Sequence, residues 1–240
     1  IGGITLPMVG LLFFIMSFMI AISCVKWKIF LNARKIHVPL YHLFLLYLVG
    51  YFFNNFLPSN VGGDVARGMI LGKQIKNASD SFGSIFLERF TGLLGLLILA
   101  CLVFAMNMKL IRIPSIGLFL CLFFIAFIVM VFLLLSEKSR KIFNFILDIY
   151  PMRLVKDKLV KFLDAIYYFR NRPLVLTQAM LISFIFHFLT VINTLVVCIA
   201  LDIDVSIIDL ATIVPIILLI AIFPVSLKGI GVWEGSFVYF

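Results

Sequence analysis

Long uncharged stretches alternate with short charged ones along this chain. Four stretches lack charged residues and approach or exceed the 20 or so apolar residues that cross a bilayer core: residues 1–25, 90–108, 116–135 and 174–201. Because the core of a bilayer cannot hydrogen-bond exposed backbone groups, spanning segments of this kind fold as helices. The pattern predicts an all-α polytopic membrane protein, built as a helical bundle.

Two further apolar stretches are interrupted. Residues 36–63 end in a run rich in Asn, Pro and Gly, and residues 210–227 contain Pro215 and Pro224 before a Lys and a glycine. Proline removes a helical hydrogen bond, and glycine weakens a helix interior. These stretches are therefore expected to be broken rather than continuous spans.

The charged loops predict sidedness. Residues 26–35 carry four Lys/Arg and no acid, and residues 136–173 carry nine Lys/Arg against four Asp/Glu. Basic loops stay on the cytoplasmic side, so both are expected there. The short loop 202–209 carries three Asp and no base, which suits the outside.

Within the second basic region, residues 155–169 have apolar positions at helical spacing and predict an amphipathic interfacial helix, with a solvated linker helix as the alternative.

Counting crossings assigns a shape to the first broken stretch. Two cytoplasmic loops need an even number of crossings between them, yet three apolar segments lie there. We therefore predict that residues 36–71 form a re-entrant hairpin, and that the segment after residue 209 forms a second one from the opposite side. Both breaks, FLPSNVGGDVARG and FPVSLKGIGVWEG, combine a Pro, glycines and a charge. Paired breaks of opposite topology predict an inverted repeat.

Composition supports lipid as the surrounding solvent. The chain is 64% hydrophobic and 13% charged, with a mean hydropathy of +1.21. Its net charge of +9 lies between apolar segments, so it favours orientation and contact with anionic lipid over nucleic acid. Residues 1–240 are expected to form a single transmembrane domain, a piece of a longer one.

Covalent chemistry is not indicated. The four cysteines form no close pair of the kind that metal sites use, and the three histidines are scattered. No catalytic residue, metal or cofactor is expected. His187 lies in an apolar span and is interpreted as a hydrogen bonder between helices.

The charged residues at the breaks are the candidate site. Asp64 and Arg67 are three apart, so they share a helix face; Arg67 could bind a phosphate or simply pair with the acid. Adjacent Glu88 and Arg89 point in different directions and are expected to find partners on other segments, Arg67 among them. The alternative for this pair is a water-facing interfacial position. The candidate headgroup-binding residues are Asn55, Pro58, Gly62, Gly63, Asp64, Arg67, Glu88, Arg89, Lys228, Gly229, Gly231 and Glu234.

Three pieces of sequence carry a family resemblance. NNFLPSNVGGDVARG, SIFLERFTGLLGL and FPVSLKGIGVWEG, in this order, resemble the flippase-like family of the lysylphosphatidylglycerol synthase transmembrane region. The chain departs from that family at Ser59, where a Gly is usual, and at Lys228, within an expected Pro-Gly-Gly run. The resemblance implies a prokaryotic plasma-membrane protein that binds or moves aminoacylated phospholipids. Relatives occur beside archaeal and bacterial glycosyltransferases and polyprenyl-linked sugars.

Three functions remain open at this point. The first is binding and translocation of a phospholipid or lipid-linked headgroup. The second is the membrane half of a lipid-modifying enzyme, such as a phosphatidylglycerol lysyltransferase or a polyprenyl-linked glycosyltransferase, which would bring a soluble catalytic partner. The third is a lipid-binding scaffold without transport. A homo-oligomer is compatible with each.

Overall fold

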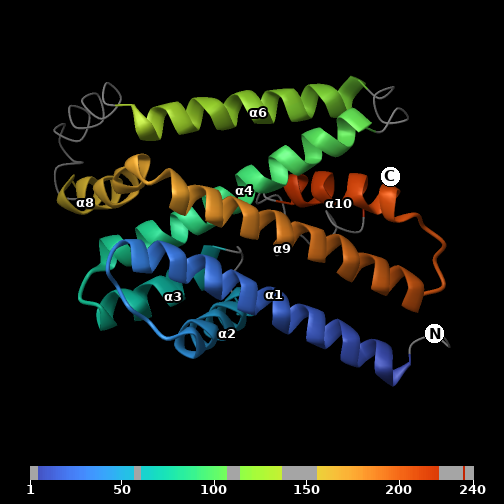
Figure 1. The fold of residues 1–240 in the computed structure, drawn as a ribbon, viewed down its shortest axis with the longest axis horizontal. Coiled ribbons are helices and arrows are strands. Elements are labelled where there is room, and N and C mark those ends of the chain that lie inside the picture. The colour runs from blue at the N-terminus through green and yellow to red at the C-terminus, as the bar shows by residue number, and fades with distance from the viewer. Residues whose placement is uncertain (1–4, 57–60, 107–113, 137–155, 222–234, 236–240) are drawn as a thin grey trace.

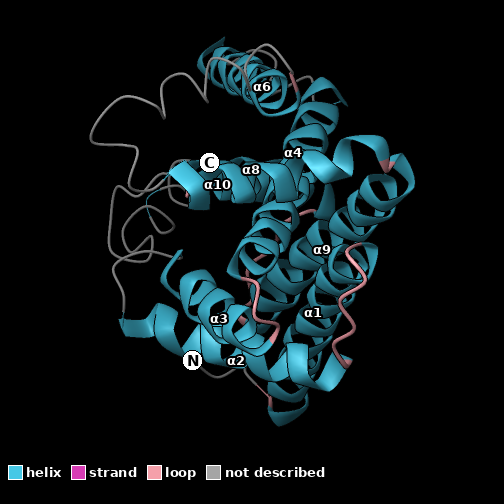
Figure 2. Cartoon of the chain, turned by 90° about the vertical axis from the view of Figure 1, so that its left-hand side faces the viewer, coloured by secondary structure: helices cyan, strands magenta, loops and turns pink. Residues whose placement is uncertain are grey.

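The computed structural model describes residues 5–56, 61–106, 114–136, 156–221 and 235, and every regular element in these ranges is a helix (Figures 1 and 2). The elements are α1 (Leu6–Ala33), α2 (Leu40–Phe56), α3 (Val61–Gln74), α4 (Ala78–Met106), α6 (Pro114–Leu135), α8 (Lys156–Tyr167), the 3-10 turn η2 (Tyr168–Asn171), α9 (Pro173–Ala200) and α10 (Ile207–Ile220).

Three helices are long and apolar enough to cross a membrane. They are α1, α4 and α9, and the almost wholly apolar α6 runs alongside α4. Large apolar side chains on α1 and α6, such as Phe13 and Phe132, are well exposed. Such surface is stable only where lipid replaces water. The predicted all-α membrane bundle is confirmed.

Helix α1 extends further than the charge pattern predicted. The expected loop 26–35 is wrong for residues 26–33, which form the last two turns of α1. Cys24, Trp27 and Leu31 are buried at helical spacing and join a core with α2, α3 and α4. This apolar stripe keeps the chain helical through Lys26, which is itself buried.

Helices α2 and α3 form a helical hairpin. Its two ends meet where His42 Nε2 lies 2.8 Å from Gln74 Oε1. Near the tip the backbones almost touch, because a Cβ added to Gly63 would lie 2.1 Å from the carbonyl oxygen of Gly50. With 17 and 14 residues, the helices are about 25 and 21 Å long, shorter than a bilayer core of about 30 Å. The chain thus returns to the end at which the hairpin begins, as the even number of crossings requires. Entry of this hairpin into a membrane stays a prediction.

Helix α4 is the central element. It packs against α1, α3, α6, α8, α9 and α10 (Figure 1). The helix predicted at residues 155–169 is confirmed as α8 with η2, and its place at a membrane interface stays a prediction. Its apolar side is buried in the bundle, where Ile166 and Phe169 pack with Phe30, Leu87 and Ala179. At the same end, the Tyr168 hydroxyl donates to the Ala33 carbonyl at 2.9 Å, so the two basic regions are neighbours.

Helix α10 contains Pro215 and continues through it to Ile220. Pro215 therefore does not break this segment, although it was expected to. The expected second break, with Pro224 and the motif that follows, lies within residues 222–234, outside the described residues. The inverted repeat consequently stays a prediction.

Candidate functional site

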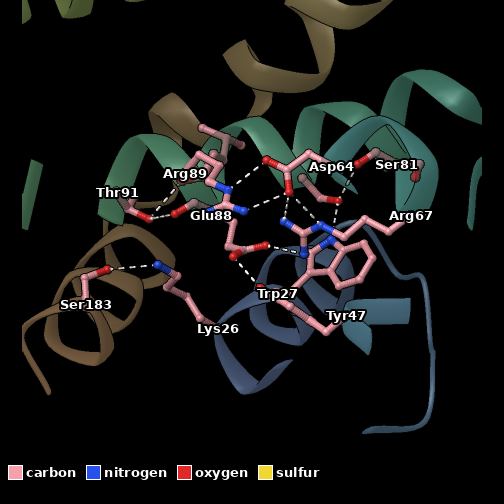
Figure 3. A network of polar contacts seen from close by, with 12 residues as sticks. Lys26, Trp27, Tyr47, Asp64, Arg67, Ser81, Glu88, Arg89, Thr91 and Ser183 are labelled. Atoms are coloured by element: carbon pink, nitrogen blue, oxygen red, sulfur yellow. Dashed lines mark hydrogen bonds and ion pairs between the residues drawn. The ribbon is translucent and has the colours of Figure 1, made fainter. Parts of the chain in front are cut away.

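Arg67 lies at the centre of a charged network on α3 and α4 (Figure 3). Its Nε donates to Asp64 Oδ1 at 3.0 Å, its Nη2 lies 3.0 Å from the same oxygen, and its Nη1 lies 3.0 Å from Glu88 Oε2. The Arg67 side chain is 1% exposed and that of Glu88 is 5% exposed. Each charge in this buried pair is thus compensated within the protein, as burial requires.

Two aromatic rings complete the cage around Arg67. Its guanidinium carbon lies 4.6 Å from the ring centroid of Trp27 and 4.3 Å from that of Tyr47. Both rings are within the range of a cation–π interaction, which strengthens when water is excluded. The Tyr47 hydroxyl also donates to Glu88 Oε1. Helices α1 and α2 therefore bind the α3–α4 charge pair from the other side.

Asp64 connects this buried pair to the surface. Its carboxylate accepts from Arg67 and also takes two bonds from Arg89, Nε to Oδ2 at 2.8 Å and Nη2 to Oδ1 at 2.9 Å. The Arg89 side chain is 57% exposed. One carboxylate therefore joins a buried guanidinium to an accessible one.

Local bonds explain why these elements meet here. Asn54 of α2 accepts from the Gly63 amide at 2.7 Å, which satisfies a donor in the first turn of α3. Ser81 of α4 donates to the Gly68 carbonyl at 2.9 Å, and Trp27 Nε1 donates to Ser84 Oγ at 2.8 Å. Polar contacts thus fix α1, α3 and α4 around the network.

A second polar group lies between α1, α4 and α9. Lys26 Nζ donates to Ser183 Oγ at 3.2 Å, and His187 Nε2 bonds the Gly92 carbonyl at 2.9 Å. The His187 bond confirms its expected role as a contact between helices. His187 Nδ1 is buried and has no hydrogen-bond partner among the described residues.

The predicted site residues fall into three groups. Asp64, Arg67, Glu88 and Arg89 are brought together, with the expected contacts from Arg67 to Asp64 and Glu88. Gly62 and Gly63 lie at the start of α3 and Asn55 lies at the end of α2, where its side chain is exposed. The others lie outside the described residues: Pro58, Lys228, Gly229, Gly231 and Glu234.

Two interpretations of these residues change. Gly63 was a candidate headgroup-binding residue; its contact with Gly50 and the bond from its amide to Asn54 account for the glycine by helix packing. Arg67 was weighed between phosphate contact and pairing, and the structure shows the pairing. Within the described part of this network, the exposed guanidinium is that of Arg89.

Sequence reasoning missed Trp27, Tyr47, Lys26 and Ser183. The apolar stripe of α1 through Cys24, Trp27 and Leu31 was a usable signal that the helix continues beyond residue 25.

Among the described residues, no group of three His, Cys, Asp or Glu side chains could hold a metal. The chemistry available is recognition of charge, above all of an anion at Arg89.

Comparison with known proteins places this chain in a family. The family model described as the lysylphosphatidylglycerol synthase TM region matches residues 3–240. A UPF0104 membrane protein of Methanothermobacter thermautotrophicus is 25% identical over an alignment of 256 positions, and the alignment covers 98% of this chain and 75% of that protein. No solved structure matches. The chain therefore belongs to the family of the lysylphosphatidylglycerol synthase TM region and is a multi-pass membrane protein.

Proposed function

We propose that this protein binds the phosphate-bearing headgroup of a membrane lipid and moves the lipid between leaflets. One observation carries the proposal: the Asp64 carboxylate is shared between Arg67, which is enclosed, and Arg89, which is exposed. A guanidinium has five N–H donors, and its fork matches the geometry of phosphate. Arg89 can therefore engage a phosphate while Asp64 stays held by Arg67.

The depth of this site supports a lipid substrate. Glu88 and Arg89 lie about 15 Å along α4 from its first residue at 1.5 Å per residue. Helix α4 has 29 residues, so it extends about 43 Å and exceeds a bilayer core of about 30 Å. A centred helix would place both residues inside the core, where charged side chains usually mark a functional site.

A route for the headgroup follows from the proposed hairpins. If the segment after α10 re-enters as the sequence predicts, two hairpins approach mid-membrane from opposite sides. The phosphate would then contact Arg89, Glu234 would meet a cationic or hydroxylated headgroup, and the acyl chains would remain in lipid. Arrangements of this type allow alternating access by rocking of one repeat against the other.

Sidedness belongs to the same proposal. Arg34 and Lys35, which follow α1, and Arg170 in η2 are basic. Because Tyr168 of η2 contacts Ala33 of α1, these regions are adjacent, and we assign both to the cytoplasmic face of a prokaryotic plasma membrane. The α2–α3 hairpin would begin and end on that face. Labelling of a cysteine at position 76 from outside the cell would contradict this assignment.

The decisive experiment is transport in vesicles. The purified protein is reconstituted into liposomes that contain fluorescent phosphatidylglycerol, and the fraction of lipid that changes leaflet is measured. Loss of a charged hydrogen bond of about 1.5–3 kcal/mol predicts that Arg89→Gln slows transport about tenfold or more. Lys73→Gln, which removes an exposed charge from the far end of α3, is the matched control.

The outcomes separate the functions. Transport by the wild type no faster than in protein-free vesicles would reject translocation. If lipid still bound to the protein in that case, the result would favour presentation of lipid to a soluble catalytic partner, the second candidate. The observation in its favour is that the matching family model is named after a synthase.

A further inference from the structure

Helix α9 has a polar face within the bundle. The polar face is formed by Ser183, His187, Thr190 and Thr194. Successive members are three or four residues apart, so they lie on one side of the helix. At 1.5 Å per residue the polar face extends about 17 Å, from the level of Lys26 towards the end of α9 that leads to α10 (Figure 1). Polar residues inside a membrane bundle normally face its interior or a water-filled cavity.

Two buried atoms of α9 have no hydrogen-bond partner among the described residues, His187 Nδ1 and Asn193 Oδ1. The other buried atoms without a hydrogen bond in that part of the chain belong to Arg34, Arg67 and Glu88, which form ion pairs. A bilayer core offers no solvent to satisfy such atoms, and a buried polar atom without a protein partner points to water. Water is therefore the partner expected at both atoms.

The imidazole of His187 shows on which side this water lies. Its Nε2 bonds the Gly92 carbonyl at 2.9 Å, and a carbonyl only accepts, so Nε2 carries the proton and Nδ1 is an acceptor. The ring carbon Cδ2 lies 3.8 Å from a Cβ added to Gly95. Nδ1 is on the opposite edge of the ring, so it points away from Gly95. Asn193, whose buried oxygen also accepts, lies about 9 Å further along α9.

Lys26 is at the inner end of the polar face. Its residue is 7% exposed, and its Nζ donates to Ser183 Oγ at 3.2 Å (Figure 3). The Ser183 hydroxyl donates in turn to the Ala179 carbonyl at 2.8 Å, so it acts on Lys26 as an acceptor. An ammonium has three N–H donors. In the described part of the chain, one of them has an acceptor, and the others are free to bond water.

The other charged and titratable groups nearby are less suited to exchange a proton. They are Glu88 and Arg89 of α4, Arg67 of α3, Tyr47 of α2 and Asp209 in the first turn of α10. Arginine does not release its proton in proteins. The Glu88 carboxylate is held by Arg67 and by the Tyr47 hydroxyl, and Asp209 bonds Ser206 at the far end of the bundle. Lys26, with His187 beside it, is thus the group that can exchange a proton with water on α9.

We infer that water along the polar face of α9 forms a pathway for protons, and that Lys26 is the group through which they cross the bundle. The ammonium gives one proton to a water molecule and becomes a neutral amine. The lone pair of the amine then takes up the next proton from water on the other side, so atoms and charge balance. The inference rests on the proposed function only for what the protons drive, which is the movement of lipid.

The residues at the inner end select the ion. A lysine repels Na⁺ and K⁺, but it is itself a carrier of protons. Chains of titratable and polar side chains inside membrane bundles serve as proton relays in pumps and transporters. The threonines of the polar face suit this role, because each hydroxyl that donates to a backbone carbonyl keeps lone pairs that accept from water.

The first test measures proton flux. The purified full chain is reconstituted into phosphatidylglycerol liposomes that hold a pH-sensitive dye, a pH difference is imposed, and the internal pH is recorded. Thr190→Val removes one hydroxyl from the polar face. Thr177→Val is the matched control, because Thr177 is exposed on another side of α9 and its hydroxyl bonds a carbonyl in the same way. Lys26→Met is paired with Lys28→Met on α1.

We expect the wild type, Thr177→Val and Lys28→Met to pass protons faster than protein-free vesicles allow. Thr190→Val should slow this flux about threefold or more, as the loss of one hydrogen bond implies. Lys26→Met should reduce it to the protein-free rate. Equal flux in the two threonine variants, or wild-type flux in Lys26→Met, would overturn the inference.

The second test does not depend on how the variants fold at the polar face. The chain has three histidines, so the double variant His37→Gln/His42→Gln leaves His187 as the single imidazole. Nuclear magnetic resonance then measures the transfer of magnetisation from water to Nδ1 of His187 in the reconstituted protein. Transfer is expected, and its absence would show that Nδ1 is dry, which would overturn the inference.

Failure of the proposed function looks different. Vesicles in which protons cross but lipid does not change leaflet would reject lipid translocation and keep the proton pathway. Lipid exchange that proceeds without proton flux and is indifferent to the imposed pH difference would reject the pathway and keep the proposed function.

Discussion

Two arginines of this protein have similar partners in different surroundings. Arg34, at the basic end of the bundle, pairs with Asp80 and lies 4.5 Å from the ring centroid of Tyr168. Arg67 likewise pairs with carboxylates and lies over aromatic rings. The Arg34 side chain is 26% exposed, whereas that of Arg67 is 1% exposed. The comparison shows that partner chemistry alone does not define a site. Burial decides how much each pair contributes.

The largest effect is expected from Arg67→Ala. Removing one member of a buried pair leaves Glu88 without its guanidinium and should destabilise the protein by about 3–5 kcal/mol. Thermal unfolding in detergent measures this loss. The double variant Arg67→Ala/Glu88→Ala should recover part of it, since the unpaired charge is then gone. A loss below about 1 kcal/mol for Arg67→Ala would contradict the assignment of this pair as buried.

Tyr47→Phe should have the next largest effect. It retains the ring over Arg67 and removes the hydroxyl that donates to Glu88. A hydrogen bond to a charged group contributes about 1.5–3 kcal/mol, and unfolding midpoints should fall accordingly. Tyr51→Phe, on the next turn of α2, is the control and should change stability by less. Equal losses of stability in Tyr47→Phe and Tyr51→Phe would show that the Tyr47 hydroxyl does not stabilise the charged network.

Arg34→Ala tests the more exposed member of the comparison. The Arg34–Asp80 pair is partly open to water, so this variant should lose less stability than Arg67→Ala, whose pair is enclosed. If Arg34→Ala lost as much stability as Arg67→Ala, water would be excluded from the Arg34–Asp80 pair as fully as from the Arg67–Glu88 pair. That result would remove the difference on which the comparison rests.

Salt should produce the smallest change and should act on one arginine. Screening at 1 M salt shortens the Debye length to about 3 Å and weakens exposed pairs. The stability difference between wild type and Arg34→Ala should therefore shrink with added salt, while the corresponding difference for Arg67→Ala should hold. Unfolding at low and high ionic strength measures both. Equal salt dependence of the two differences would place the arginines in the same environment.

Much of the charged site could be predicted from the sequence. The three-residue spacing of Asp64 and Arg67 predicted one contact, and the need of charges in an apolar chain for partners predicted the contact of Arg67 with Glu88. The rings of Trp27 and Tyr47 could not be foreseen, because which face of α1 and α2 meets α3 is a property of packing.

The burial of Lys26 was missed for a different reason. A run of basic residues after an apolar span is typical of a loop, and that rule outweighed the helical spacing of Cys24, Trp27 and Leu31. Charge patterns indicate the side of a membrane better than they indicate where a helix ends. The count of crossings predicted a re-entrant hairpin at residues 36–71; α2 and α3 do pack together there, and their re-entry into a membrane stays a prediction.

The order of the partners along the chain has a consequence for biogenesis. Trp27 and Tyr47 precede Arg67, but Glu88 follows it by about 20 residues. At a synthesis rate of 5–20 residues per second, Arg67 emerges on the order of one to four seconds before Glu88. An unpaired arginine is costly at the centre of an inserted helix. Helix α3 should therefore remain outside the lipid during synthesis and insert together with α4, so the charge pair would set the moment of membrane integration.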